Sequence, residues 1–108
     1  MTQSNYPAVG HVYKATFGDL AYHLDFSNDG KTMEFSSVGT ADPVAQPVVT
    51  VEYTAKEVAP GVFMVYWKEP DGSTVVHVED FNQDKVFTNI TLPDHQFLNL
   101  EGTFKLLK

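Results

Sequence analysis

The segment 73–81, STVVHVEDF, carries the residues best suited to chemistry. If it forms a β-strand, Val75, His77 and Glu79 lie on one face, because side chains alternate along a strand. A histidine and a glutamate on an otherwise apolar face are costly to bury without partners. If this face lines an interior, both groups suit general acid–base chemistry there. The alternative is an exposed face on which both side chains meet water.

The turn before this segment decides which residues share that face. If Pro70-Asp71-Gly72 forms a three-residue loop, Glu69 pairs with Ser73 and Trp67 joins the face of the histidine and the glutamate. If Asp71-Gly72 is a two-residue turn, Tyr66 takes that place, because a one-residue slip exchanges the faces.

The turn after the segment sets its other neighbour. A turn at Gln83-Asp84 pairs Phe81 with Val86 and places Thr88 and Ile90 beside the glutamate and the histidine. This apolar neighbour favours an interior position, so we expect the tryptophan, the histidine and the glutamate to point inward.

A second histidine and acid, His23 and Asp25, lie opposite the more apolar face of their segment, so a solvated surface is the better interpretation. His23 and His77 on neighbouring or facing strands could hold zinc together with Asp25 or Glu79. The chain has no His-x-His pair or similar ligand spacing, and we expect neither a metal nor a cofactor.

The elements that must position these residues are short apolar or aromatic runs separated by turn residues at the spacing typical of an all-β sandwich or barrel. We predict a single small antiparallel up-and-down β-barrel of about eight strands, with 1–108 as one domain and 1–9 as an N-terminal extension. The connection 39–47 is long and is either a lid over one mouth or a slack loop. The predicted strands are 11–17, 20–27, 31–38, 48–58, 62–68, 73–81, 85–92 and 97–107.

Charge and composition exclude several functions. The 108-residue chain has a net charge of −7, and its basic residues are seven scattered lysines without any arginine. Without a basic stripe, nucleic acid is not expected as a partner, and a highly anionic ligand is disfavoured. There is no cysteine, hence neither disulfides nor a cysteine nucleophile. We see no signal sequence and no membrane span, and we expect a cytoplasmic protein without a membrane partner.

Three stretches together resemble the MoaF-like family, small bacterial proteins named after molybdenum cofactor biosynthesis protein F. The stretches are YHLDFSNDGKTMEFSSVG, PGVFMVYWKEPDGSTVVHVEDF, and VFTNITLPD followed after one residue by QFLNLEGTFKLL. The resemblance extends from about Gly10 to the end and is most distinctive at 67–81. It implies a calycin-like, lipocalin-like antiparallel barrel and little chemistry. Calycin-like barrels include phenolic acid decarboxylases with lumenal Tyr, Glu and Arg, and the lack of arginine argues against such an enzyme here.

Our first functional hypothesis is a small-molecule binding protein with a mostly apolar or aromatic, neutral ligand in the barrel lumen. Tyr22, Tyr53 and Trp67 would supply stacking surface, and His77 and Glu79 would supply oriented hydrogen bonds. The alternative is a cofactor-free isomerase, dehydratase or cyclase in the same pocket. There Glu79 would be the base, with His77 as the acid or as the group that orients it.

An interaction with a second copy is also expected. The segments 62–67 and 75–78 are apolar on both faces, and a small barrel cannot bury both. A homodimer through an outer wall is compatible with either functional hypothesis.

Overall fold

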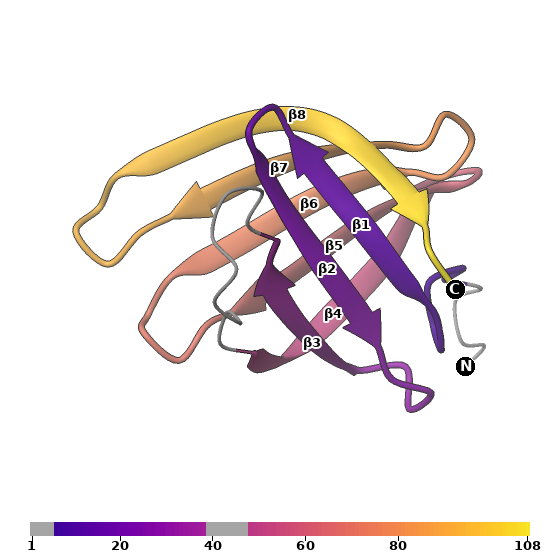
Figure 1. Ribbon diagram of the computed structural model, residues 1–108, viewed down its shortest axis with the longest axis horizontal. Coiled ribbons are helices and arrows are strands. Elements are labelled where there is room, and N and C mark those ends of the chain that lie inside the picture. The colour runs from indigo at the N-terminus through magenta and orange to yellow at the C-terminus, as the bar shows by residue number, and fades with distance from the viewer. Residues whose placement is uncertain (1–5, 39–47) are drawn as a thin grey trace.

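The computed structural model describes residues 6–38 and 48–108, and in it the chain forms a closed barrel of antiparallel strands (Figure 1). Each strand pairs with its neighbours in the chain, and the last strand pairs with the first. The eight strands are β1 (Val12–Phe17), β2 (Leu20–Phe26), β3 (Thr32–Ser37), β4 (Val49–Ala59), β5 (Val62–Lys68), β6 (Thr74–Asp80), β7 (Lys85–Thr91) and β8 (Phe97–Leu106).

This architecture confirms the predicted all-β barrel and is consistent with the calycin-like fold that the resemblance implies. Each observed strand end lies within one residue of its predicted position. The connection 39–47, expected to be a lid or a slack loop, lies outside the described residues. In the described part of the chain we find no helix with the length and apolar character that a membrane span requires.

The loop between β5 and β6 is the three-residue type. The Glu69 amide donates to the Ser73 carbonyl at 2.8 Å, and Gly72 has a φ of 98°, which a glycine adopts without strain. Trp67 therefore lies opposite Val75. The tryptophan shares the inward face of β6, as the three-residue alternative predicts.

The predicted pairing between β6 and β7 is wrong by two residues. Val86 lies opposite Glu79 rather than Phe81, and the last pair before the turn is Asp80 with Lys85. Because the shift is even, the same residues still point inward. Thr88 consequently lies opposite the histidine instead of the glutamate.

Local hydrogen bonds explain the longer turn at Phe81–Asp84. The two carboxylate oxygens of Asp80 accept from the Asn82 amide at 2.9 Å and from the Gln83 side chain at 3.0 Å. The turn ends at Asp84, whose φ of 56° is left-handed, a conformation that aspartate tolerates better than most residues. These contacts stabilise a four-residue loop, Phe81–Asp84, in place of the two-residue turn predicted at Gln83-Asp84.

An aromatic plug fills the half of the barrel in which β1 begins and β8 ends. Its centre is Tyr6, whose ring lies 5.3 Å from that of Phe63 and 5.5 Å from that of Phe26, measured between centroids. Such edge-to-face and tilted contacts add to the free energy of burial. The plug consists of Tyr6, Tyr13, Phe26, Tyr53, Phe63, Phe81 and Phe104.

Closure of the barrel depends on the bend of β8, which curves from β7 across to β1 (Figure 1). Gly102 lies at the point where the end of β1 comes against β8. A Cβ atom added there would collide with the Thr16 carbonyl oxygen and the Phe17 ring. Only glycine permits this close approach of two backbones.

We expect Gly102→Ala to lower the free energy of unfolding by about 2–3 kcal/mol, because the methyl group must displace the backbone of β1. Chemical denaturation measures this loss, with Thr103→Ala at the adjacent exposed position as the control. A loss for Gly102→Ala no larger than that of the control would show that β1 and β8 do not depend on this contact.

Candidate functional site

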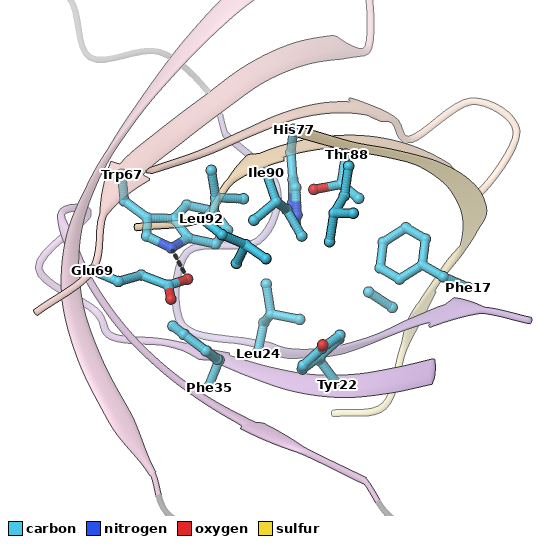
Figure 2. Close-up of a pocket in the computed structure, with 13 residues that line it drawn as sticks. Phe17, Tyr22, Leu24, Phe35, Trp67, Glu69, His77, Thr88, Ile90 and Leu92 are labelled. Carbon is cyan, nitrogen blue, oxygen red and sulfur yellow. Dashed lines mark hydrogen bonds between the residues drawn. The ribbon is translucent and has the colours of Figure 1, made fainter. Parts of the chain in front are cut away.

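A cavity of about 280 Å³ occupies the half of the barrel beyond the aromatic plug (Figure 2). Its deep wall is formed by buried side chains that include Leu24, Trp67 and Val75. Its mouth is formed by more exposed ones, which are Tyr22, Phe35, Glu69, Leu92 and Leu98. The cavity is therefore apolar, with a small number of polar groups at defined depths.

The deepest polar groups come from neighbouring positions on β6 and β7. His77 and Thr88 lie directly opposite each other, line the cavity and are 4% and 2% exposed. The Trp67 ring stands nearly perpendicular to the imidazole, at 4.8 Å between centroids. The indole thus packs against one side of the imidazole. Figure 2 shows the histidine and the threonine side by side on one wall.

Glu79 connects this wall with the aromatic plug. Its side chain has no exposed surface, and its two oxygens accept hydrogen bonds from opposite directions. The Tyr6 hydroxyl donates to Oε1 at 2.5 Å, and His77 Nδ1 lies 2.9 Å from Oε2. Because a carboxylate only accepts, Nδ1 of the imidazole carries a proton toward Glu79, and in the neutral form of the ring Nε2 is left as an acceptor.

Burial governs the titration of the tyrosines in the plug. Desolvation, reinforced by the neighbouring Glu79 carboxylate, raises the pKa of Tyr6 well above its usual range. Desolvation, with smaller contributions from Asp29 and Glu79, raises the pKa of Tyr53 to about 12. Both hydroxyls therefore stay protonated at neutral pH, and that of Tyr6 remains a donor to the glutamate.

Three buried hydroxyls, those of Tyr53, Ser73 and Thr88, have no hydrogen-bond partner among the described residues, and of these only Thr88 lines this cavity. Buried polar atoms almost always have a partner, so an orphan on a cavity wall marks a place where a bound polar group would be stabilised.

Glu69 also lines the cavity, although the sequence indicated only that it lies next to a turn. It lies at the mouth, where its Oε2 accepts from Trp67 Nε1 at 3.1 Å. Burial raises the pKa of its carboxyl, and the nearby Asp71 adds to this effect. Strand alternation could have found it, since Glu69 follows Trp67 by two positions.

Three of the predicted ligand-binding residues line the cavity, namely Tyr22, Trp67 and His77. Two lie elsewhere. Glu79 is behind the histidine rather than on the cavity wall, because both of its oxygens are engaged. Tyr53 belongs to the plug and borders a second cavity at the opposite end, because β4 directs it toward the Tyr6 ring.

The remaining candidates do not join the site. Asp25 is exposed and His23 half-buried, and the inward residues of β2 are their neighbours Tyr22 and Leu24. Within residues 6–38 and 48–108, no three His, Asp or Glu side chains gather as metal ligands would. Tyr6, which orients the site through the glutamate, was missed because the N-terminal segment shows no strand pattern.

Comparisons with known proteins agree with this architecture. A family model described as MoaF-like matches residues 9–105. A crystal structure of a Burkholderia vietnamiensis protein, named "putative beta-lactamase", resembles this one with a TM-score of 0.86 at 28% sequence identity. The likeness covers 97% of this chain and 100% of that chain. No curated protein matches the chain.

We expect Tyr6→Phe to lower the free energy of unfolding at neutral pH by about 1–3 kcal/mol, because Glu79 Oε1 loses its donor. It should also flatten the alkaline loss of stability. The folded-state pKa of Tyr6 is raised above the unfolded value near 10, so its contribution is complete below about pH 10 and is lost at higher pH.

Denaturant titrations between about pH 7 and pH 11 measure both effects. Tyr66→Phe, on the outer face of β5, is the matched control and should leave the pH profile unchanged. If the two variants show the same alkaline slope as the parent protein, the hydroxyl of Tyr6 is not held by the glutamate.

Proposed function

Because the chain belongs to the MoaF-like family and encloses an apolar cavity in a closed barrel, we propose that it binds one small, mostly apolar or aromatic molecule in the lumen. The observation that carries this proposal is the contrast within the cavity. Its walls are mostly apolar, whereas His77 is held by Glu79 from outside the cavity and the Thr88 hydroxyl is left without a partner among the described residues. Pockets of this kind bury the body of a ligand and orient it through a few hydrogen bonds.

The size and surfaces of the cavity define the ligand further. A volume of about 280 Å³ is at the lower end for ligand pockets and fits a molecule of one or two rings. Trp67, Tyr22 and Phe35 offer aromatic surface around it. In its neutral form His77 would accept a hydrogen bond at Nε2, and the Thr88 hydroxyl can donate or accept.

The name of the Burkholderia vietnamiensis protein raises the question of β-lactam hydrolysis. Serine β-lactamases need a Ser-x-x-Lys motif, and none of the five serines in this chain is followed by a lysine at that spacing. We therefore do not extend this activity to the chain.

The expected homodimer stays a prediction. Apolar side chains form a row on the outer wall across three strands, where Met64 lies opposite Val78 and Val78 lies opposite Phe87. Phe87 is 38% exposed. This row is the surface that a second copy would cover.

We expect 4-phenylbutanol, a neutral aromatic probe, to change the Trp67 emission saturably with a Kd of about 1 mM or tighter. Trp67 is the only tryptophan, so the signal reports on the cavity wall. Val75→Phe should weaken binding at least about tenfold by filling the cavity, whereas Val76→Phe on the outer face should not.

Thermal unfolding of both variants verifies that each is folded. Equal binding by the folded Val75→Phe and Val76→Phe proteins would place the probe outside the lumen and contradict the proposed function.

A second candidate function, cofactor-free acid–base catalysis, is favoured by the bond between His77 Nδ1 and Glu79 Oε2. This pair resembles the orientation of a histidine base by a carboxylate in many enzymes. Here the roles differ from those expected from the sequence. His77 would exchange a proton with the substrate at Nε2, and Glu79 would be a positioning residue.

The probe for this function is 2-tetralone, an apolar ketone with exchangeable α-protons. We expect the protein to speed deuterium uptake at these carbons, as followed by NMR in D₂O, more than free imidazole at equal concentration. Exchange should vanish in His77→Gln and slow about tenfold or more in Glu79→Gln, which keeps the shape but weakens the orientation of the ring. Exchange that is unaffected in His77→Gln would refute the catalytic role.

A further inference from the structure

Glu69 is the acidic side chain at the mouth of the cavity, and its surroundings are not those of an ordinary surface glutamate. It is half-buried and lines the cavity, with Trp67 Nε1 as a donor to its Oε2. Among the described residues it forms no ion pair. Its carboxylate thus lies in a partly desolvated position without an ion-pair partner, and burial raises its pKa although Trp67 and His77 act in the opposite direction.

Two aromatic rings lie beside this carboxylate. The rings of Phe35 and Trp67 lie 6.2 Å apart between centroids, and Figure 2 shows Glu69 between them at one side of the cavity, with Tyr22 on the adjacent wall. The face of an aromatic ring carries partial negative charge and attracts cations, most strongly for tryptophan. A carboxylate close to aromatic rings is a typical environment for an ammonium group.

Among the described residues that line the cavity, none carries a permanent positive charge that could pair with Glu69. No lysine of the described chain lines it, and the sequence 39–47 contains no basic residue. The deep nitrogen, His77 Nε2, is assigned as an acceptor because Nδ1 donates to the glutamate behind it. The net charge of −7 also favours approach of a cation over an anion.

We propose that the cavity is specific for amines, with a ligand ammonium group bound between Glu69, Trp67 and Phe35 and an apolar or aromatic body in the lumen. This inference rests on the proposed function and replaces the neutral ligand expected from the sequence. The ligand is an alkyl or arylalkyl amine, because the interior beyond the mouth is lined mostly by apolar side chains.

Three probes of the same shape test the charge preference: 4-phenylbutylamine, 4-phenylbutanol and 4-phenylbutyrate. We expect the amine to bind about tenfold tighter than the alcohol, and the carboxylate to bind most weakly, by Trp67 fluorescence and by calorimetry. The experiment uses the intact protein.

Glu69→Gln removes the charge and keeps an acceptor for the indole, so it should abolish the preference for the amine over the alcohol. Glu34→Gln is the matched control, since it removes one charge on the outer face of β3 and next to Phe35 in sequence. The control should retain the preference for the amine, which excludes an effect of net charge alone.

The outcomes separate the two proposals. Saturable binding of the alcohol together with no advantage for the amine overturns the amine site and leaves lumenal binding in place. An advantage that survives in Glu69→Gln, or disappears equally in Glu34→Gln, also overturns the site, because the attraction then comes from the protein as a whole. Failure of all three probes to bind contradicts both proposals.

Discussion

The structure depends on one buried carboxylate, that of Glu79. A charge without exposed surface is tolerated only where donors satisfy its oxygens, and here the donors come from two distant parts of the chain. The N-terminal segment supplies the Tyr6 hydroxyl, and the same strand supplies the imidazole two residues away. This arrangement fixes the N-terminal segment inside the barrel and fixes the ring of His77. The aromatic plug and the polar wall of the cavity therefore depend on each other.

The division of the barrel into a plug and a cavity explains why so small a protein can keep an interior space. Aromatic rings in edge-to-face and stacked contacts fill one half, including a Tyr13–Phe104 pair 4.6 Å apart. These contacts supply packing that the other half lacks. His77 and Thr88 then enter the cavity at inward positions of β6 and β7, because the pleat determines which side chains point inside, and Glu69 enters it from just beyond the end of β5.

Much of this could be predicted from the sequence, since alternation and turn residues are local signals. They indicated about eight strands in a barrel and favoured the inward orientation of Trp67, His77 and Glu79, and the structure has both features. The pairing of β6 with β7 could not be predicted in this way, because the side chains of Asp80 and its neighbours lengthen the turn without changing the alternation of apolar residues. Tyr6 was missed since its partner is 73 residues away and no periodicity indicates such a contact.

The order of strands also has a consequence for how the molecule folds. Seven of the eight strand pairings join consecutive strands, so each hairpin can form from residues that are close in sequence. The pairing of β1 with β8 and the bond between Tyr6 and Glu79 instead join distant residues, and their loop-closure entropy is lost only when the chain ends meet. We therefore expect local hairpins to form before closure, so that the cavity is enclosed only when β1 pairs with β8.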